Sequence, residues 1–377
     1  MKAIELLTRI ENMGIEVVAG VPDSTLKQFC DGLQLYEGKF RHYVTANEGA
    51  AVGVAVGTYL ASGKPACVYM QNSGIGNIVN PLVSLANKDV YGIPMLFIVG
   101  WRGEPGIKDE PQHVFQGKIT CKLFDTLEVP YAVIDKETTV EELDTILRRA
   151  EEAFLQNCQF AIIVKKDTFA ADKKFIWENG NALVREEVLE ELLQVLPSDA
   201  CIVSTTGKIS RELYEQSNKL WGNHDLMFMT VGGMGHASMI AFGIAAQKPD
   251  KTVVCIDGDG AALMHMGALP FLASHAPKNF VHIIINNQAH ESVGAMPTDC
   301  QQTNFAAMAK TAGYISAERI TDMDGVKELR NKLNCVEGPV LFEIMVSLDS
   351  RPDLSRPAET ARENREVFMK KLSPKGE

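Results

Sequence analysis

Residues 252–260 read Thr-Val-Val-Cys-Ile-Asp-Gly-Asp-Gly, an apolar run that ends in a glycine-rich turn. A short apolar run bounded by turn residues is typical of a parallel strand that is buried on both faces. The turn places the carboxylate of Asp259 at the carboxyl end of that strand, where open α/β sheets bind ligands. Gly258 and Gly260 let the backbone approach phosphate oxygens, and the N–H groups of a following helix favour negative charge. The stretch therefore predicts a ligand-binding edge of a parallel sheet.

A pair of asparagines follows at a spacing that predicts a position at the same edge of the sheet. After 25 further residues, Asn286 and Asn287 end the apolar run over 281–285. That length holds one helix and a return strand, so we expect Asn287 beside Asp259. The carboxylate of Asp259, the amide oxygen of Asn287 and the backbone carbonyl of Ala289 would form a half-shell of hard oxygens, which suits Mg²⁺ holding a diphosphate.

The turn has two other possible interpretations, an ordinary connection between a strand and a helix and a dinucleotide-binding site. A Gly-Asp-Gly turn alone also occurs as an ordinary connection between a strand and a helix, and only the spacing to Asn287 favours the metal site. A dinucleotide site is disfavoured, because Gly258-Asp-Gly260-Ala-Ala-Leu263 lacks the third glycine and no acidic residue follows about 20 positions on.

The chain repeats its pattern once, at a shift of 186 positions. Residues 48–57, Glu-Gly-Ala-Ala-Val-Gly-Val-Ala-Val-Gly, align with residues 234–243, Met-Gly-His-Ala-Ser-Met-Ile-Ala-Phe-Gly. The apolar runs over 66–70 and 95–99 align with those over 252–256 and 281–285. In each half, apolar runs alternate with helical stretches and Gly-rich loops, which is the pattern of parallel sheets covered by helices. The predicted fold class is α/β, with two doubly wound parallel-sheet domains related by this repeat.

Composition along the chain predicts the boundaries of these domains. The first domain is predicted over 1–167, and it closes with a helix whose capping box is Thr139 and Glu142, followed by a strand over 161–164. A charged segment without apolar periodicity predicts a linker over 168–182. The second domain is expected over 183–350, and a polar tail with a surface helix over 351–377.

Charge and composition exclude several classes of protein. The 377 residues carry a net charge of −11, which argues against a nucleic-acid partner, because affinity for a phosphate backbone rests on clustered Lys and Arg. Apolar stretches of about ten residues are too short to span a bilayer, and no secretory signal is visible. The eight cysteines are never closer than 35 residues and most lie in apolar runs. A cytoplasmic protein with reduced, buried thiols and no membrane partner is expected.

The turn at Gly258-Asp259-Gly260 together with Asn286-Asn287 resembles the thiamine diphosphate fingerprint of the pyruvate decarboxylase superfamily. The resemblance covers nearly the whole chain. It implies a pyrimidine-binding domain in the first half, a diphosphate-binding domain in the second and no middle domain between them. Glu48 stands where that superfamily keeps its cofactor-activating glutamate, and Met234 where a bulky apolar residue props the cofactor in its bent form.

Two-domain chains of this kind resemble the phosphonopyruvate and sulfopyruvate decarboxylase families. Five motifs are most similar to the phosphonopyruvate decarboxylase family: Gly20-Val-Pro-Asp-Ser24, Gly100-Trp-Arg-Gly103, Asp109-Glu-Pro-Gln-His113, Thr205-Thr-Gly-Lys208 and Gly233-Met-Gly-His236. The resemblance implies decarboxylation of a 2-keto acid with thiamine diphosphate and Mg²⁺, and a homo-oligomer whose cofactor site is shared between subunits. A sulfopyruvate decarboxylase, another keto-acid decarboxylase and a non-catalytic cofactor-binding paralogue remain alternatives.

The resemblance also implies positions for the cofactor and the substrate. Around the cofactor we expect Glu48, Thr206, Gly207, Lys208, the carbonyl of Gly232, Met234, Gly258, Asp259, Gly260, Ala261 and Asn287. Around the anionic tail of the substrate we expect Ser24, Asn72, Ser73, Arg102, His113 and His290, with Lys108 a weaker candidate. The loop with Gly103, Pro105 and Gly106 is a candidate lid.

Besides Glu48, catalytic parts are expected for Ser24, Asp23 and His113. Asp23 is the least expected of these, because a carboxylate repels an anionic substrate unless it is protonated or paired. A part in proton relay is the only interpretation that its position offers.

Overall fold

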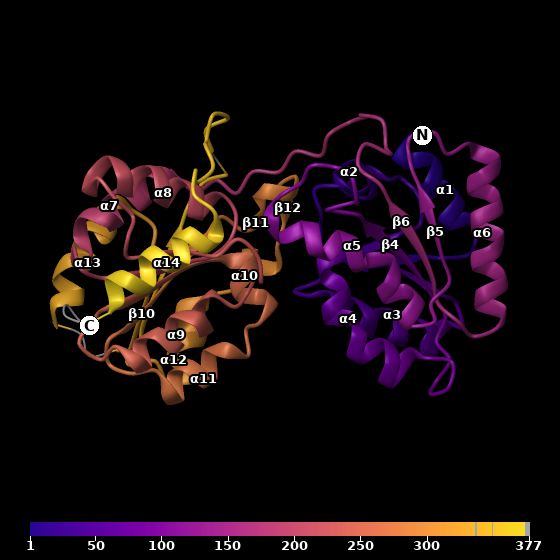
Figure 1. Cartoon of the computed structure of the whole chain (residues 1–377). Coiled ribbons are helices and arrows are strands. Elements are labelled where there is room, and N and C mark those ends of the chain that lie inside the picture. Colours follow the sequence, from indigo (N-terminus) through magenta and orange to yellow (C-terminus); the bar gives the residue numbers. More distant parts are fainter. Residues whose placement is uncertain (336–337, 349, 374–377) are drawn as a thin grey trace. The chain divides into compact units, whose positions relative to one another are not determined.

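The structure is a computed structural model, and it describes residues 1–335, 338–348 and 350–373. The chain divides into two compact units (Figure 1). Unit 1 consists of Met1–Trp177 together with Val293–Met296, and unit 2 of Glu178–Ser292 together with the chain from Pro297 onward. Within the described part of the chain, no helix has both the length and the apolar character needed to cross a membrane.

Unit 1 is built on a six-stranded sheet whose strands pair in parallel, in the order β2-β1-β3-β4-β6-β5. Its strands are β1 (Val17–Gly20), β2 (Arg41–Val44), β3 (Ala66–Gln71), β4 (Met95–Gly100), β5 (Tyr131–Ile134) and β6 (Phe160–Val164). Its helices are α1 (Ala3–Asn12), α2 (Lys27–Leu35), α3 (Glu48–Ser62), α4 (Ile75–Pro81), α5 (Pro111–Thr126) and α6 (Val140–Leu155), with a 3₁₀ turn η1 (Asn72–Gly74) and a π-helical turn η2 (Leu82–Ala86).

Unit 2 is built on a second six-stranded parallel sheet, in the order β13-β14-β10-β9-β7-β8. Its strands are β7 (Cys201–Ser204), β8 (Met227–Met229), β9 (Val253–Gly258), β10 (Phe280–Asn286), β13 (Ser316–Ile320) and β14 (Val340–Met345). Its helices are α7 (Arg185–Val195), α8 (Lys208–Trp221), α9 (Ala237–Gln247), α10 (Asp259–Met264), α11 (Ala268–His275), α12 (Phe305–Ala312), α13 (Met323–Cys335) and α14 (Ala361–Leu372). The short elements β11 (Ala289–His290), η3 (Glu291–Val293), β12 (Met296–Pro297) and η4 (Asp299–Gln301) lie outside both sheets.

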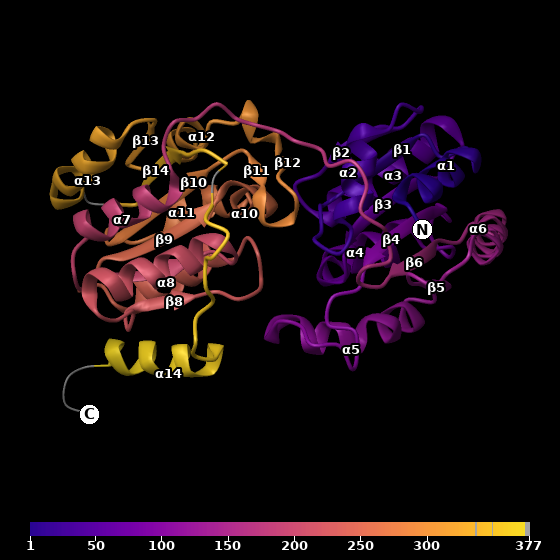
Figure 2. The same cartoon turned by 90° about the horizontal axis from the view of Figure 1, so that it is seen from above.

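Helices cover both faces of each sheet, because alternate strand residues point to opposite faces and both sets are apolar. In unit 1, helices α1, α2 and α6 pack on one face, where Val18 lies, and α3, α4 and α5 on the other, where Val17 and Ala19 lie. In unit 2, α7, α8 and α13 share one core, and α9, α11, α12 and α14 the other. Figure 2 shows each sheet with its helices from above. The predicted fold class, two doubly wound α/β domains, is confirmed.

The strands follow one another in the same spatial order in both sheets. In each, the second strand of the unit comes first, followed by the first, third, fourth, sixth and fifth. The order therefore reverses direction between the first and the third strand, and loops that leave such a switch point form the ligand-binding crevice of doubly wound sheets. These are the loops after β1 and β3 in unit 1, and after β7 and β9 in unit 2.

The last helix, α14, is packed against the edge of the second sheet. The amide of Asn364 donates to the carbonyl of Met227 at 2.9 Å and accepts from the N–H of Met229 at 3.2 Å, so it bonds with the edge strand β8. Phe368 is buried beside the ring of Phe228, with 5.8 Å between centroids. The domain boundaries expected from the sequence, at 167, 182 and 350, stay predictions.

Candidate active site

Glu48 begins helix α3, and its side chain is 4% exposed. The preceding Asn47 caps the helix by accepting a hydrogen bond from the N–H of Ala50 at 2.9 Å. Asn77 on α4 donates from Nδ2 to Oε2 of Glu48 at 2.7 Å. Burial raises the pKa of Glu48, and the hydrogen bond from Asn77 offsets part of that rise. The result is a buried carboxyl group held by a neutral amide, which suits a group that gives and takes a proton.

The position of this carboxyl group depends on Gly74. A Cβ atom at Gly74 would lie 2.4 Å from Oε1 of Glu48, so no other residue fits without moving the carboxylate. Gly74 closes the 3₁₀ turn η1 at the end of β3. Neither Gly74 nor Asn77 was predicted as a site residue.

Asp23 lies in the loop after β1 and is fully buried. Its Oδ2 accepts from the N–H of Thr25 at 2.9 Å and of Leu26 at 3.2 Å, while Oδ1 has no hydrogen-bond partner among the described residues. Burial raises the pKa of Asp23 to about 6, although the nearby charge of Arg102 opposes the rise. Gly100, at the end of β4, makes room for it, since a Cβ atom there would lie 2.1 Å from Oδ2.

The loop between β4 and α5 is closed by an ion pair between two of the predicted motifs. Arg102 donates from Nε to Asp109 Oδ2 at 2.8 Å and from Nη2 to Oδ1 at 2.5 Å, and the N–H of Gly103 also donates to Oδ2. The pKa of Asp109 lies well below its usual range, because these bonds outweigh the effect of burial. Arg102 reaches Ser24 as well, donating from Nη1 to the hydroxyl at 2.9 Å.

This pairing limits the candidate lid. The carbonyl oxygen of His113 lies against Gly103, where a Cβ atom would approach it to within 2 Å, and Gly103 has a φ of +69°. The start of the loop is therefore fixed on α5, while residues 105–108 are exposed. The ring of His113 is half-buried, and its pKa is lowered by burial and by the charge of Arg102. Lys108 is exposed.

Asn72 differs from the expectation that it contacts the substrate. Its side chain is fully buried, and Nδ2 donates to the carbonyl of Arg102 and to the hydroxyl of Thr120, both at 2.8 Å. Its Oδ1 accepts from the N–H of Arg102 at 3.2 Å. The amide connects the turn η1 with the loop after β4 and with helix α5, so its nitrogen and its oxygen are both engaged within the protein. Ser73 beside it is exposed and accepts from the amide of Gln71 at 2.7 Å.

In unit 2, Asp259 begins α10 directly after β9 and is 4% exposed. Its Oδ2 accepts from the hydroxyl of Thr298 at 2.9 Å. Burial raises the pKa of Asp259 to about 7, and the groups that oppose this rise, led by the Thr298 hydroxyl, are neutral. A buried carboxylate that lacks a compensating positive charge in the protein is a natural partner for a cation.

Asn287 is at the same edge of the sheet. Strands β9 and β10 are adjacent and parallel, with Ile285 opposite Gly258, so Asp259 and Asn287 both follow directly on paired strand ends. Asn287 is 6% exposed and its Oδ1 accepts from the N–H of Ala289 at 3.2 Å. A buried carboxylate and a buried amide oxygen therefore follow adjacent strand ends of the same sheet. Their part in binding a metal, together with the carbonyl of Ala289, stays a prediction.

Three further predicted residues lie together in this unit. A Cβ atom at Gly260 would come within 2.8 Å of the ring of His290 and 3.4 Å of the terminal methyl group of Met234. Gly260 is therefore a point of close approach between these side chains. Burial lowers the pKa of His290 to about 4, so its ring is neutral at neutral pH.

The loop after β7 holds the remaining predicted residues of unit 2. Thr206 donates from its hydroxyl to the carbonyl of Val231, next to Gly232, at 3.2 Å. Gly207 has a φ of +100° and precedes helix α8, which begins at Lys208. The ammonium group of Lys208 is already bound, to Glu291 Oε1 at 2.8 Å and to the hydroxyl of Ser350 at 2.6 Å. Lys208 is thus paired within the protein, whereas we expected it to reach the diphosphate.

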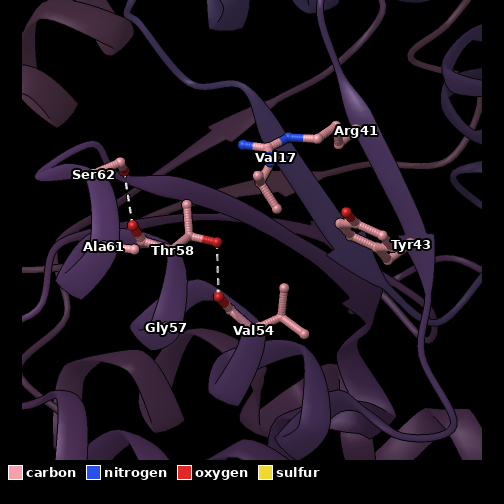
Figure 3. A pocket seen from close by; sticks show the side chains of 8 residues that line it. All are labelled: Val17, Arg41, Tyr43, Val54, Gly57, Thr58, Ala61 and Ser62. Atoms are coloured by element: carbon pink, nitrogen blue, oxygen red, sulfur yellow. Dashed lines mark hydrogen bonds between the residues drawn. The ribbon is translucent and has the colours of Figure 1, made fainter.

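A surface pocket of about 360 Å³ lies elsewhere in unit 1, along strand β2 and the C-terminal half of α3 (Figure 3). Its walls include Arg41, Tyr43 and Thr58. The hydroxyls of Thr58 and Ser62 bond to carbonyls of their own helix, at 2.8 and 2.7 Å. None of the predicted site residues lines this pocket.

Two family models match the chain, the thiamine pyrophosphate enzyme N-terminal TPP binding domain over residues 3–126 and the C-terminal TPP binding domain over residues 215–344. A curated phosphonopyruvate decarboxylase of Streptomyces viridochromogenes is 32% identical, over 96% of this chain and 92% of that protein. A second, of Streptomyces hygroscopicus, is 33% identical over 97% and 94%.

The chain belongs to the phosphonopyruvate decarboxylase family of thiamine pyrophosphate enzymes. This confirms the family resemblance and the enzyme class inferred from the sequence. A sulfopyruvate decarboxylase of Methanosarcina acetivorans is 26% identical, over 89% of this chain and 88% of that protein. The family's N-terminal domain model covers Glu48 and Asn77, and its C-terminal model covers Asp259 and Asn287.

Proposed function

We propose that the chain catalyses the non-oxidative decarboxylation of phosphonopyruvate to phosphonoacetaldehyde and CO₂, with thiamine diphosphate and Mg²⁺. The observation that carries the proposal is the similarity, at 32% and 33% identity, to two phosphonopyruvate decarboxylases along nearly the full length of each. In the reaction, the bond between the keto carbon and the carboxylate breaks, CO₂ leaves, and a proton takes its place on the former keto carbon.

The predicted residues of unit 2 fit the cofactor. The buried Asp259, with only neutral groups opposing its pKa rise, and the amide oxygen of Asn287 would hold Mg²⁺, with the backbone at Ala289 as a third donor. The loop at Thr206–Gly207 and the junction of β9 and α10 at Gly258–Ala261 would face the diphosphate through backbone N–H groups. Gly232 and Met234 would contact the rings of the cofactor. Bound thiamine diphosphate supplies the nucleophile for the keto carbon and accepts the electron pair that remains when CO₂ leaves.

Two buried carboxyl groups of unit 1 would move protons. Glu48 holds or releases a proton toward the aminopyrimidine, and Asn77 fixes which oxygen is free to do so. Asp23 has one oxygen without a partner among the described residues, and the charge of Arg102 lies nearby. With a pKa of about 6, Asp23 can accept and release a proton near neutral pH.

The phosphonate tail needs positive or hydrogen-bonding groups. In unit 1, Arg102 donates to Ser24, and its charge acts on His113 in the first turn of α5. In unit 2, His290 lies beside Gly260. Arg102 is neutralised in part by Asp109, so it would offer the tail hydrogen bonds more than an unpaired charge.

We also propose a homo-oligomer in which the cofactor site is formed by Glu48 of one subunit and Asp259 of another. The resemblance to the family supports this proposal, as does the division of the predicted residues between two separate units. The free state of the seven cysteines described is compatible with the reducing cytoplasm that we propose as its location.

The experiment that tests the function follows CO₂ release from phosphonopyruvate, sulfopyruvate and pyruvate side by side, with thiamine diphosphate and Mg²⁺. We expect kcat/KM for phosphonopyruvate to exceed the others by about a hundredfold, or roughly 2.7 kcal/mol of transition-state discrimination. A preference for sulfopyruvate would overturn the substrate but keep the chemistry. No turnover of any of the three, and no effect of EDTA on cofactor binding, would overturn the assignment of Asp259 and Asn287.

A further inference from the structure

The orientation of the Asn287 amide is fixed by two neighbours of opposite character. Its Nδ2 donates to Oε2 of Glu291 at 2.9 Å, and its Oδ1 accepts from the N–H of Ala289 at 3.2 Å. A carboxylate can only accept and a backbone N–H can only donate, so a flipped amide would lose both bonds. The oxygen and the nitrogen of Asn287 are therefore assigned by chemistry, and this matters because only the oxygen can bind a cation.

Glu291 is itself held by two basic side chains. Lys208 donates to its Oε1 at 2.8 Å, and Nη1 of Arg185 pairs with Oε2. Arg185 also forms two bonds of 2.7 Å with Glu212. Arg185 and Glu212 are buried at 2% and 1% exposure. The negative charges of Glu291 and Glu212 are balanced by the positive charges of Arg185 and Lys208. Such pairing offsets the cost of removing charged groups from water.

We propose that Glu291 is a positioning residue for Asn287, which it turns so that the amide oxygen and not the NH₂ group faces the cation. Arg185 and Lys208 keep the Glu291 carboxylate in place. This inference rests on the proposed function, because it assumes that Asn287 binds Mg²⁺. It also gives Lys208 a part in the site that needs no contact with the diphosphate.

The neighbouring residue provides a matched control. Asn286 has the same arrangement: its Nδ2 donates to Oε1 of Glu343 at 2.8 Å and its Oδ1 accepts from the N–H of Gln288 at 3.0 Å. Glu343 is paired with Arg319 at 2.8 Å, and both Asn286 and Glu343 are fully buried. Asn286 differs from Asn287 in that it lies within strand β10 and is not a proposed ligand of the cation.

The test compares Glu291→Ala, Glu291→Gln and Glu343→Ala with the wild type. The measured quantity is the Mg²⁺ concentration needed for half-maximal binding of thiamine diphosphate. Binding is monitored by titration calorimetry. Loss of an outer partner of a metal ligand costs tenfold to a hundredfold in metal affinity in known sites. We expect Glu291→Ala to raise the required Mg²⁺ at least about tenfold, and Glu343→Ala to change it less than about threefold.

Glu291→Gln separates positioning from charge. Glutamine keeps one oxygen, which can still accept from Asn287, although the charge is lost. We expect Glu291→Gln to bind Mg²⁺ much better than Glu291→Ala. Equal weakening in both variants would mean that charge alone matters, and this would overturn the positioning role.

The controls separate failure of this inference from failure of the proposed function. The melting temperature of each variant is measured, and equal loss of Mg²⁺ affinity in Glu343→Ala and Glu291→Ala would indicate general loosening of the fold and overturn the inference. Unchanged Mg²⁺ dependence in Glu291→Ala would overturn the inference while the function stands. A wild type that binds no thiamine diphosphate at any Mg²⁺ concentration would overturn both.

Discussion

At the scale of single residues, the carboxyl group of Glu48 has little freedom. Asn77 donates to one of its oxygens, and the backbone of Gly74 lies so close to the other that a Cβ atom would approach it to 2.4 Å. Both neighbours come from the chain segment after β3, not from the helix that carries Glu48. The effect of a mutation there depends on whether it moves the carboxylate, and glycines of the same segment differ in this respect.

Replacement of Gly74 by alanine should move the Glu48 carboxylate and leave the fold intact, because the clash is with the end of a flexible side chain. We expect kcat for CO₂ release to fall by about 10²-fold or more, as misplaced catalytic groups typically lose that much. The matched control is Gly76→Ala two residues on, where a Cβ atom meets nothing within 4 Å. Equal activity of the two variants would contradict the constraint on Glu48.

Replacement of Asn77 by alanine should shift the pH dependence of kcat/KM. The hydrogen bond from Asn77 lowers the pKa of Glu48, which burial raises, so without that bond the pKa rises further. The midpoint of the pH profile that reports Glu48 should therefore move to higher pH. Asn80→Ala, on the same helix at an exposed position, should leave the midpoint in place. A shift of the midpoint to lower pH in Asn77→Ala would contradict the inference that this hydrogen bond lowers the pKa of Glu48.

Residues that belong to a recognisable motif or spacing could be proposed from the sequence. Residues whose part depends on contacts with distant segments could not. Glu48 and Met234 could be proposed from the family resemblance, and Asp259 with Asn287 from their spacing. Glu291 gave no such signal, because its partners Lys208 and Arg185 lie 83 and 106 residues away in the chain. For the same reason Lys208 and Asn72 were expected to contact ligands, although protein groups occupy their side chains here.

At the scale of elements, the loop between β4 and α5 depends on one carboxylate. Asp109 accepts from the guanidinium of Arg102 and from the N–H groups of Gly103 and Glu110. Hydrogen bonds that involve a charged group each contribute about 1.5–3 kcal/mol. Without Asp109 the loop should open more often, since 1.4 kcal/mol already corresponds to roughly a tenfold change in the opening equilibrium.

Asp109→Ala should therefore make Lys108 more accessible to trypsin. Because residue 109 is part of the cleaved bond, the native rate after Lys108 is divided by the rate in the denatured chain of the same protein. We expect this ratio to become about tenfold higher in the variant. Cleavage after Lys173, in the segment between the two sheets, serves as the internal reference and should keep its rate. Equal ratios for Lys108 in the variant and the wild type would show that Asp109 does not hold the loop.

The loop after β1 should make stability depend on pH. Asp23 has a pKa of about 6 in the folded chain against 3.8 as the ordinary value, so the folded state keeps a proton that the unfolded state loses. The contribution of Asp23 to the free energy of unfolding is then greatest below pH 4, and it falls as the pH rises to about 6. The difference between these two pKa values corresponds to about 3 kcal/mol of the free energy of unfolding at most.

Asp23→Asn removes this titration. Relative to the variant, the wild type should lose thermal stability between pH 4 and 6, and the difference should stay constant above about pH 7. The measurement is the melting temperature of both proteins over this range of pH. A difference that is independent of pH would mean that Asp23 does not titrate in the folded chain near pH 6.

The strands were easier to predict than the contacts between distant segments that surround them. The apolar runs over 66–70 and 281–285 fall within β3 and β10, because buried parallel strands must be apolar on both faces. The capping box of Thr139 and Glu142 was also predicted and is present. In contrast, the π-helical turn η2 and the packing of α14 through Asn364 depend on contacts between distant segments, and local patterns carry no trace of them.

At the scale of the whole molecule, both units have the same strand order although few residues are shared between them. A common order brings equivalent loops to the switch point of each sheet, and the side chains on those loops differ between the two units. Unit 1 supplies the buried Glu48 and Asp23, and unit 2 supplies Asp259 and Asn287. Neither set is complete for the proposed chemistry, because proton transfer and metal binding are separated between the units.

This separation makes the shared site testable with two inactive variants. In a symmetric dimer, each proposed site takes Glu48 from one subunit and Asp259 from the other. When Glu48→Ala and Asp259→Ala are mixed equally and exchange subunits, half of the dimers are mixed, and each of these has one site with both residues intact and one with neither. We expect recovery of about a quarter of the wild-type rate of CO₂ release. If both residues of a site came from the same chain, every site in the mixture would lack one of them. Proven subunit exchange without any recovery of activity would therefore rule out the shared site.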